Sequence, residues 1–180
     1  MRVSRVEDWP QAAPLQTERL ALEPLRVEHA DEMVTVLADP SLYGFTGGSA
    51  PTLEELTAAY HRRIEVGASD TEKRWCNWVV RDRATGAAVG AMQGEITALG
   101  GGALQGELSW IFGVEHQGRG YAREAAAAVA AWMRGVGEVR LIADIHPEHV
   151  ASMRVARSLG LSQTDEVVHG GELRWTDRCA

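Results

Sequence analysis

A short glycine-rich segment between an apolar strand and an alanine-rich helix is the feature that most constrains this sequence. Gln117-Gly118-Arg119-Gly120 follows the strand-like run 107–113, and helical periodicity extends from about Gly120 to Arg134. Glycine lets the backbone turn sharply and approach a ligand without an intervening Cβ. The next helix points its free N–H groups and positive dipole end into the same loop, which favours phosphate. The sequence therefore predicts a β–loop–α unit that holds an anion.

This segment matches neither of two well-known nucleotide fingerprints. No glycine stands at position 123, as the pattern GxGxxG would require after Gly118 and Gly120, and GxxxxGK[ST] is also missing. A plain tight connection with solvated arginines is the alternative interpretation.

The rest of the chain alternates between strand and helix patterns and predicts a single α/β domain with a mixed sheet. Strands are expected at 19–24, 75–81, 87–96, 107–113, 139–145, 162–169 and 172–177, and helices at 28–38, 52–66, 120–134 and 149–159. Thr52 and Glu55 form a capping box, and Gly170-Gly171 marks a two-residue hairpin turn. The order is β-α-α-β-β-β-α-β-α-β-β. Residues 1–16 lack periodicity and are interpreted as an N-terminal extension to a domain spanning 17–180.

Composition argues against several function classes. The 180 residues include 25 acidic and 18 basic ones, and the net charge of −7 suits nucleic acid poorly. Cys76 and Cys179 are far apart and outside any Cys/His cluster, so neither a disulfide framework nor a metal site is expected. No apolar run reaches the ~18 residues of a membrane span, and the start lacks a signal-peptide pattern. A cytoplasmic protein without a membrane partner is the expectation.

Ordered motifs in the chain resemble the GNAT acyltransferases, which bind acetyl-CoA. Gln117-x-x-Gly120-x-Ala122 is similar to the family motif Q/R-x-x-G-x-G/A, and 107–112 resembles the family's fourth strand. Residues 147–161 resemble P-x-N-x-A-S-x-R-V-A-x-x-L-G-F, and 17–22 resemble T-x-R-L-x-L. Both are typical of the ribosomal-protein N-terminal acetyltransferase (Rim-type) branch. The resemblance covers 17–178 and implies a GNAT fold with splayed central strands.

The resemblance also implies how the cosubstrate acetyl-CoA is held. The pantetheine arm lies in the gap between the splayed strands, beside backbone groups of Ile111, Phe112 and Val114. The pyrophosphate lies on amides from Gly118 to Ala122. The residues implied in cofactor binding are Ile111, Phe112, Val114, Gln117, Gly118, Arg119, Gly120, Tyr121, Ala122, His149, Ser152 and Arg154.

In such enzymes an amine attacks the thioester directly, which requires a base and an acid. Glu107 is the candidate base, and a solvated or ion-paired glutamate is the alternative. The tyrosine that many members use as acid is replaced by Ala156, so Ser152 is the candidate acid, or else a locally bonded helix serine. His149 stands at a usual asparagine position, where a cofactor contact or a helix cap is favoured over catalysis.

The acceptor site is expected near the first two helices. Tyr43, Phe45 and Trp110 are its candidate residues, with core packing as the alternative, above all for Trp110. Residues 1–116 contain ten basic and seventeen acidic residues, a balance that would attract a cationic amine.

These observations predict an N-acetyltransferase that moves an acetyl group from acetyl-CoA to a primary amine. The amine belongs either to a protein N-terminus or to a small molecule such as an antibiotic. A non-catalytic acyl-CoA-binding or sensor module is the alternative that the missing tyrosine keeps open. Members of the branch are often monomers or dimers, so a homodimer is compatible with the resemblance.

Overall fold

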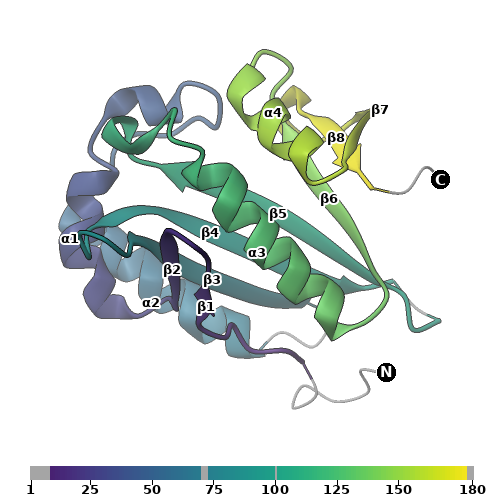
Figure 1. Ribbon diagram of the computed structural model, residues 1–180, viewed down its shortest axis with the longest axis horizontal. Helices are drawn as coiled ribbons and strands as arrows, with labels where there is room; N and C mark the ends of the chain where they lie inside the picture. Colours follow the sequence, from purple (N-terminus) through teal and green to yellow (C-terminus); the bar gives the residue numbers. More distant parts are fainter. Residues whose placement is uncertain (1–8, 70–72, 100, 178–180) are drawn as a thin grey trace.

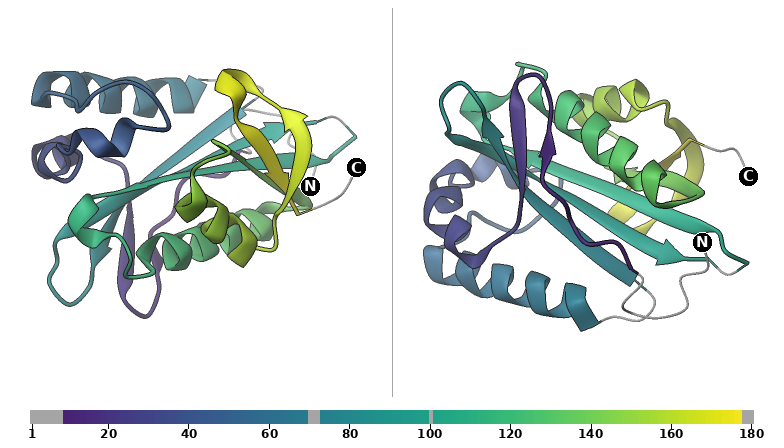
Figure 2. Two further views of the ribbon diagram at one scale, coloured as in Figure 1. Left: turned by 90° about the horizontal axis from the view of Figure 1, so that it is seen from above. Right: turned by 60° about the horizontal axis from the view of Figure 1, so that its bottom comes forward.

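A mixed β-sheet with helices on both faces organises the protein (Figures 1 and 2). The computed structural model describes residues 9–69, 73–99 and 101–177. Within these ranges the sheet has eight strands in the order β1-β2-β3-β4-β5-β6-β8-β7, antiparallel except for the parallel pair β5–β6. The strands are β1 Leu15–Gln16, β2 Leu20–Pro24, β3 Lys73–Asp82, β4 Ala88–Ala98, β5 Leu104–Phe112, β6 Val139–Ile145, β7 Ser162–Val167 and β8 Leu173–Thr176.

The helices divide between the two faces of this sheet. They are α1 Ala30–Val36, α2 Leu53–Ser69, α3 Tyr121–Val136 and α4 Val150–Ser158. Helices α1 and α2 cover one face, and α3 and α4 cover the other (Figure 2). The expected α/β class and element order are confirmed, with the short strand β1 added before the first expected strand.

Strand β5 shows how the sequence assigns its side chains to these faces. Leu104, Leu108 and Phe112 are buried in the cluster that α3 covers, whereas Ile111 packs with the cluster under α1 and α2. Because successive strand residues point to opposite faces, Glu107 lies on the same side as Ile111. The base candidate is therefore on the α1–α2 side of the sheet.

Glycines in the sheet allow α3 to pack closely on it. A Cβ on Gly94 would lie 2.3 Å from the Cε atom of Met133, and one on Gly106 would lie 3.0 Å from its Sδ atom. These contacts leave no room for a larger residue. The close approach involves the last turn of α3, whereas the first turn follows the end of β5 through the 3₁₀ turn Val114–His116 and the glycine-rich loop.

The central strands separate where the resemblance predicts a gap. Strands β5 and β6 pair only from Leu104 with Val139 to Glu107 with Ile142. Beyond this point β5 continues to Phe112 and β6 to Ile145 without pairing to each other. The expected splay is confirmed, and Glu107 lies at its apex.

The described part of the N-terminal extension packs on the sheet. Trp9 is buried, and the Trp78 indole Nε1 donates a hydrogen bond of 2.8 Å to the Ala13 carbonyl. Strand β1 pairs with β2. The division of the chain between residues 16 and 17 stays a prediction.

Two local expectations can be compared directly with the structure. The capping box is confirmed, because the Thr52 amide donates to the Glu55 carboxylate (2.8 Å) and the Glu55 amide donates to the Thr52 hydroxyl (3.3 Å). The final hairpin turn is longer than the two residues expected. Strand pairing stops at Val167 and Leu173, because a 3₁₀ turn over His169–Gly171 intervenes.

The expectations about membrane spans, metal sites and cysteines can be compared with the described residues. In these ranges no helix is long and apolar enough to cross a membrane, and no group of three or more His, Cys, Asp or Glu side chains could hold a metal ion. Cys76 is a buried free thiol, and Cys179 lies outside the described residues.

Candidate active site

The glycine-rich loop has the backbone that its sequence predicts. Gly118 and Gly120 have φ angles of +73° and +80°, in the left-handed region that disfavours side chains. Gly120 is the N-cap of α3, and within the described part of the chain no side-chain hydrogen bond caps this helix end. Its first amides are therefore available to an anion at the mouth of the splay.

Two residues of the loop motif have structural partners that the sequence did not reveal. The Gln117 amide Nε2 donates to the Phe112 carbonyl at 3.0 Å, which closes the loop back onto β5. The Tyr121 ring is buried and its hydroxyl donates to the Asp82 carboxylate. Only the backbone of Tyr121 thus faces the loop. Arg119 is exposed and Ala122 is half-buried.

Arg19, directly before β2, contacts this loop and the first turn of α3. Arg19 forms an ion pair with Glu124 in the first turn of α3, with 2.6 Å between Nη2 and Oε2. It also donates from Nη1 to the Arg119 carbonyl at 3.0 Å and stacks its guanidinium 5.0 Å from the Tyr121 ring centre. The loop conformation therefore depends on residues about a hundred positions away.

Glu107 lies between two carboxylates that each have a cation. Glu95 is directly opposite on β4 and pairs with Lys73 at 2.7 Å. Asp144 on β6 forms a two-pronged bond with Arg174 at 2.9 Å. Glu107 itself has no ion pair among the described residues. Burial, and then the negative charges of Asp144 and Glu95, raise the pKa of Glu107.

A fourth carboxyl group approaches the same end of the sheet. Burial, and then the charge of Asp144, raise the pKa of Glu172, which precedes β8. The sequence analysis singled out neither Glu95, Asp144 nor Glu172. The sequence shows that these acidic residues lie in or next to predicted strands. It does not show the strand register that brings them close to Glu107.

A side-chain hydrogen bond joins β5 to α4 across the splay. The Trp110 indole Nε1 donates to the Ser152 Oγ atom at 3.2 Å. Ser152 has no bond to a helix carbonyl among the described residues, so the local alternative for this serine is wrong. Its hydroxyl hydrogen remains available to another acceptor.

His149 makes a ring contact in place of a cap. It occupies the N-cap position of α4, but its side chain makes no capping bond, so the cap alternative is wrong. Its ring stacks on Phe45 with centroids 4.5 Å apart, and Phe45 also lies 5.2 Å from the His146 ring. Burial, and then His146, lower the pKa of His149, which favours a neutral imidazole. Phe45 thus contacts the β6–α4 connection.

The remaining cofactor candidates have mixed placements. Ile111 is half-buried, Phe112 is buried and Val114 is 42% exposed. The Phe112 carbonyl already accepts the bond from Gln117. Arg154 is exposed on α4, so its side chain is free to approach a ligand.

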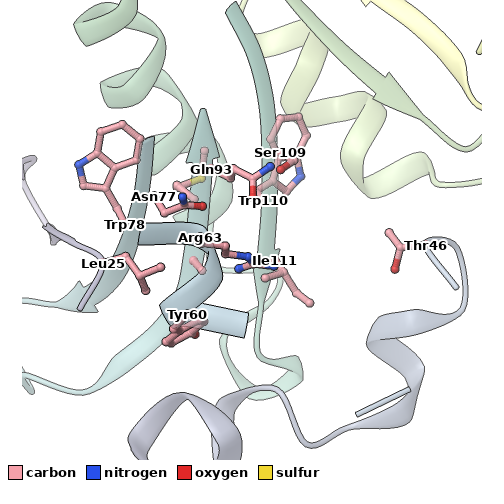
Figure 3. Close-up of a pocket in the computed structure, with 12 residues that line it drawn as sticks. Leu25, Thr46, Tyr60, Arg63, Asn77, Trp78, Gln93, Ser109, Trp110 and Ile111 are labelled. Atoms are coloured by element: carbon pink, nitrogen blue, oxygen red, sulfur yellow. The ribbon is translucent and has the colours of Figure 1, made fainter. Parts of the chain in front are cut away.

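A pocket of about 200 Å³ opens on the α1–α2 side of the sheet (Figure 3). It is lined by Leu25, Thr46, Tyr60, Arg63, Asn77, Trp78, Ala91, Met92, Gln93, Ser109, Trp110 and Ile111. Of the three acceptor candidates only Trp110 lines it. The Tyr43 hydroxyl instead donates to the Leu37 carbonyl at 2.9 Å, and Phe45 stacks on His149.

Comparisons with known proteins agree with this architecture. The family model of the acetyltransferase (GNAT) domain matches residues 19–162. The comparison with curated proteins found no match.

Three solved structures illustrate the likeness of the fold. The GNAT-family acetyltransferase from Bacillus anthracis has a TM-score of 0.71 at 19% identity, covering 91% of this chain and 96% of its own. The ribosomal-protein-S5-alanine acetyltransferase from Vibrio fischeri has a TM-score of 0.72 at 17% identity, covering 91% and 95%. RimL, a ribosomal L7/L12 alpha-N-protein acetyltransferase in complex with coenzyme A, has a TM-score of 0.71 at 14% identity, also covering 91% and 95%.

Proposed function

The chain belongs to the GNAT acetyltransferase family, whose members use acetyl-CoA as cosubstrate, and we propose that its acceptor is a primary amine. The amine is carried either by a protein N-terminus or by a small molecule. One observation carries the proposal. Glu107 is a half-buried carboxyl group without an ion pair in the described structure, and it lies where β5 and β6 separate.

The residues present fit acetyl-CoA, which supplies the acetyl group as a thioester. The two left-handed glycines and the uncapped start of α3 suit the pyrophosphate, and the amides of Gly118 to Ala122 would hold it. Beyond Glu107, β5 pairs with β4 but not with β6, so its edge facing β6 offers backbone groups to the pantetheine arm. Ile111 and Phe112 would hold the arm there.

Glu107 would take the proton from the ammonium form of the acceptor. Its raised pKa brings this carboxylate closer to the proton affinity of an amine than an ordinary glutamate would be. Because the carboxylate must be ionised to act, the rate is expected to rise with pH through this raised pKa.

Ser152 would give a proton to the departing sulfur. The Trp110 indole occupies one lone pair of the Ser152 Oγ atom and so holds the hydroxyl in a fixed orientation. Arg154 on the exposed side of α4 would meet the cofactor phosphates.

Release of free thiol from acetyl-CoA, measured with a panel of peptides and amines, tests the proposal. Glu107→Gln is expected to lower kcat by about 100-fold or more while CoA binding is retained. Asp165→Asn, a change at an exposed position of β7, is the matched control and is expected to leave kcat unchanged. Tight CoA binding without turnover on any amine would instead favour a non-catalytic sensor module.

A further inference from the structure

Three uncharged polar side chains form one row across the floor of the pocket. Asn77 on β3 is opposite Gln93 on β4, and Gln93 is opposite Ser109 on β5. Residues in such register point to the same face of an antiparallel sheet. All three line the pocket that α2 covers (Figure 3).

This row has polar groups that the protein leaves unused. No hydrogen bond of these three side chains is found within the described residues. Asn77 is 9% exposed, Gln93 is half-buried and Ser109 is exposed, so water reaches the row. Buried polar groups are almost always bonded, because an unpaired one loses its hydration without compensation. Asn77 is the most buried member of the row, so it is the best placed of the three to bond a polar ligand that displaces water from the pocket floor.

The charge of the pocket restricts what that ligand is. No carboxylate is found among the described residues that line it, whereas Arg63 of α2 is part of the lining. Arg63 lies over the Tyr60 ring, 5.9 Å from its centre, and has no ion pair in the described part of the chain. Arg63 is exposed, and in Figure 3 its side chain extends from α2 to lie beside Ile111 of the pocket lining. Five guanidinium N–H donors suit an anion and repel a cation.

The row lies immediately beside the proposed base. Ser109 and Glu107 are two residues apart on β5, which separates their rows by about 7 Å. An amine and a side chain of the same residue can bridge this distance. The pocket volume of about 200 Å³ is below the roughly 300–1,000 Å³ of sites for drug-sized ligands, so it suits a single residue.

We propose that this pocket binds a carboxylate carried by the same residue as the acceptor amine, such as the side chain of an N-terminal glutamate. The inference rests on the proposed acetyl transfer and names the class of its acceptor. Arg63 pairs with the carboxylate, and the amides of Asn77 and Gln93 complete its hydrogen bonds. The acidic residues of the N-terminal half do not line this pocket, so they do not select the group bound there.

Peptides that differ only in their first residue test the proposal, with free glutamate as an additional acceptor. The value of kcat/KM is expected to be about tenfold or more higher for a first glutamate than for glutamine, and lowest for lysine. Arg63→Gln is expected to reduce the glutamate-to-glutamine ratio to near one. Arg62→Gln, a neighbouring exposed arginine of α2 that does not line the pocket, is the matched control and should keep the ratio.

The two sources of the carboxylate are separated by the same assay. Turnover of free glutamate as fast as of the peptide would support the proposal with an amino acid as acceptor, and turnover of the peptide alone would support it with a protein N-terminus. The proposal of a carboxylate-binding pocket would be overturned if all first residues gave equal rates, or if the lysine peptide or a polyamine reacted fastest. Acetyl transfer itself would still stand. Absence of turnover with every amine, despite CoA binding, would overturn the proposed function itself.

Discussion

Replacing Gly118 with alanine separates the cost of a left-handed backbone from any steric clash. Gly118 has a φ angle of +73°, and a Cβ built on it meets nothing within 4 Å. The alanine side chain therefore costs only the strain of the left-handed region, about 1–2 kcal/mol. Where the free protein keeps the left-handed conformation, that strain corresponds to a decrease in Tm of roughly 2–8 °C for a chain of this length.

The hairpin between β3 and β4 contains a matched control. Gly86 has a φ angle of +74°, and a Cβ at this position would also have nothing within 4 Å of it. Gly86→Ala should therefore lower the free energy of unfolding by about the same 1–2 kcal/mol. The two variants differ only in where the strain lies.

Coenzyme A binding distinguishes the two positions. In Gly118→Ala the strain is counted once: to the extent that the free loop relaxes out of the left-handed conformation, Tm is spared and CoA binding must restore that conformation. A restoring cost of about 1–2 kcal/mol raises the Kd for CoA by roughly 5–30-fold. Gly86→Ala leaves this Kd unchanged. Titration calorimetry measures the Kd, and differential scanning calorimetry measures Tm.

Two results would refute the reasoning. If Gly118→Ala kept the parent Tm, as a relaxed loop would, and still bound CoA as tightly as the parent protein, the left-handed loop would not be the pyrophosphate site. If Gly86→Ala weakened CoA binding equally, the loss would follow general destabilisation instead of loop geometry.

Three further outcomes follow from the site and the core. Glu95→Gln removes a negative charge opposite Glu107 and so favours the ionised form of Glu107. The acid limb of the kcat/KM–pH profile should move to lower pH, and an unmoved limb would contradict the influence of Glu95 on Glu107. Trp110→Phe removes the hydrogen bond to Ser152 and should lower kcat about fivefold. This loss should disappear in a Ser152→Ala background, and additive losses would show that Trp110 does not act through Ser152. Burial raises the pKa of Cys76 to about 12, so in a Cys179→Ser background iodoacetamide should not alkylate Cys76 at pH 8.5 until the protein unfolds, as mass spectrometry would show.

The conformation of the glycine-rich loop could be predicted from the sequence because its signals are local, whereas its role in binding the cofactor stays a prediction. The two glycines at 118 and 120 are needed for their own φ angles, and the capping box at Thr52 is completed within four residues. The strand predicted at 139–145 from its apolar pattern likewise agrees with the bounds of β6. Such features depend on neighbours in the chain, which a sequence displays directly.

The acceptor side could not be predicted because it depends on register. Asn77, Gln93 and Ser109 come from three strands, and nothing local indicates that they share one row. Tyr43 was chosen for its type, but its hydroxyl bonds the Leu37 carbonyl that ends α1. Tyr60 is buried and yet lines the pocket.

The insertion of β8 between β6 and β7 has a consequence for biosynthesis. Until Leu173–Thr176 has been synthesised, one edge of β6 lacks its final partner, and the sequence of that strand is mostly apolar and β-branched. Unpaired edges of this kind template aggregation. The ion pair of Arg174 with Asp144 forms only at the same late stage. A nascent chain stalled before the last hairpin would therefore be a substrate for chaperones, although the two segments proposed to bind the cofactor have already been synthesised.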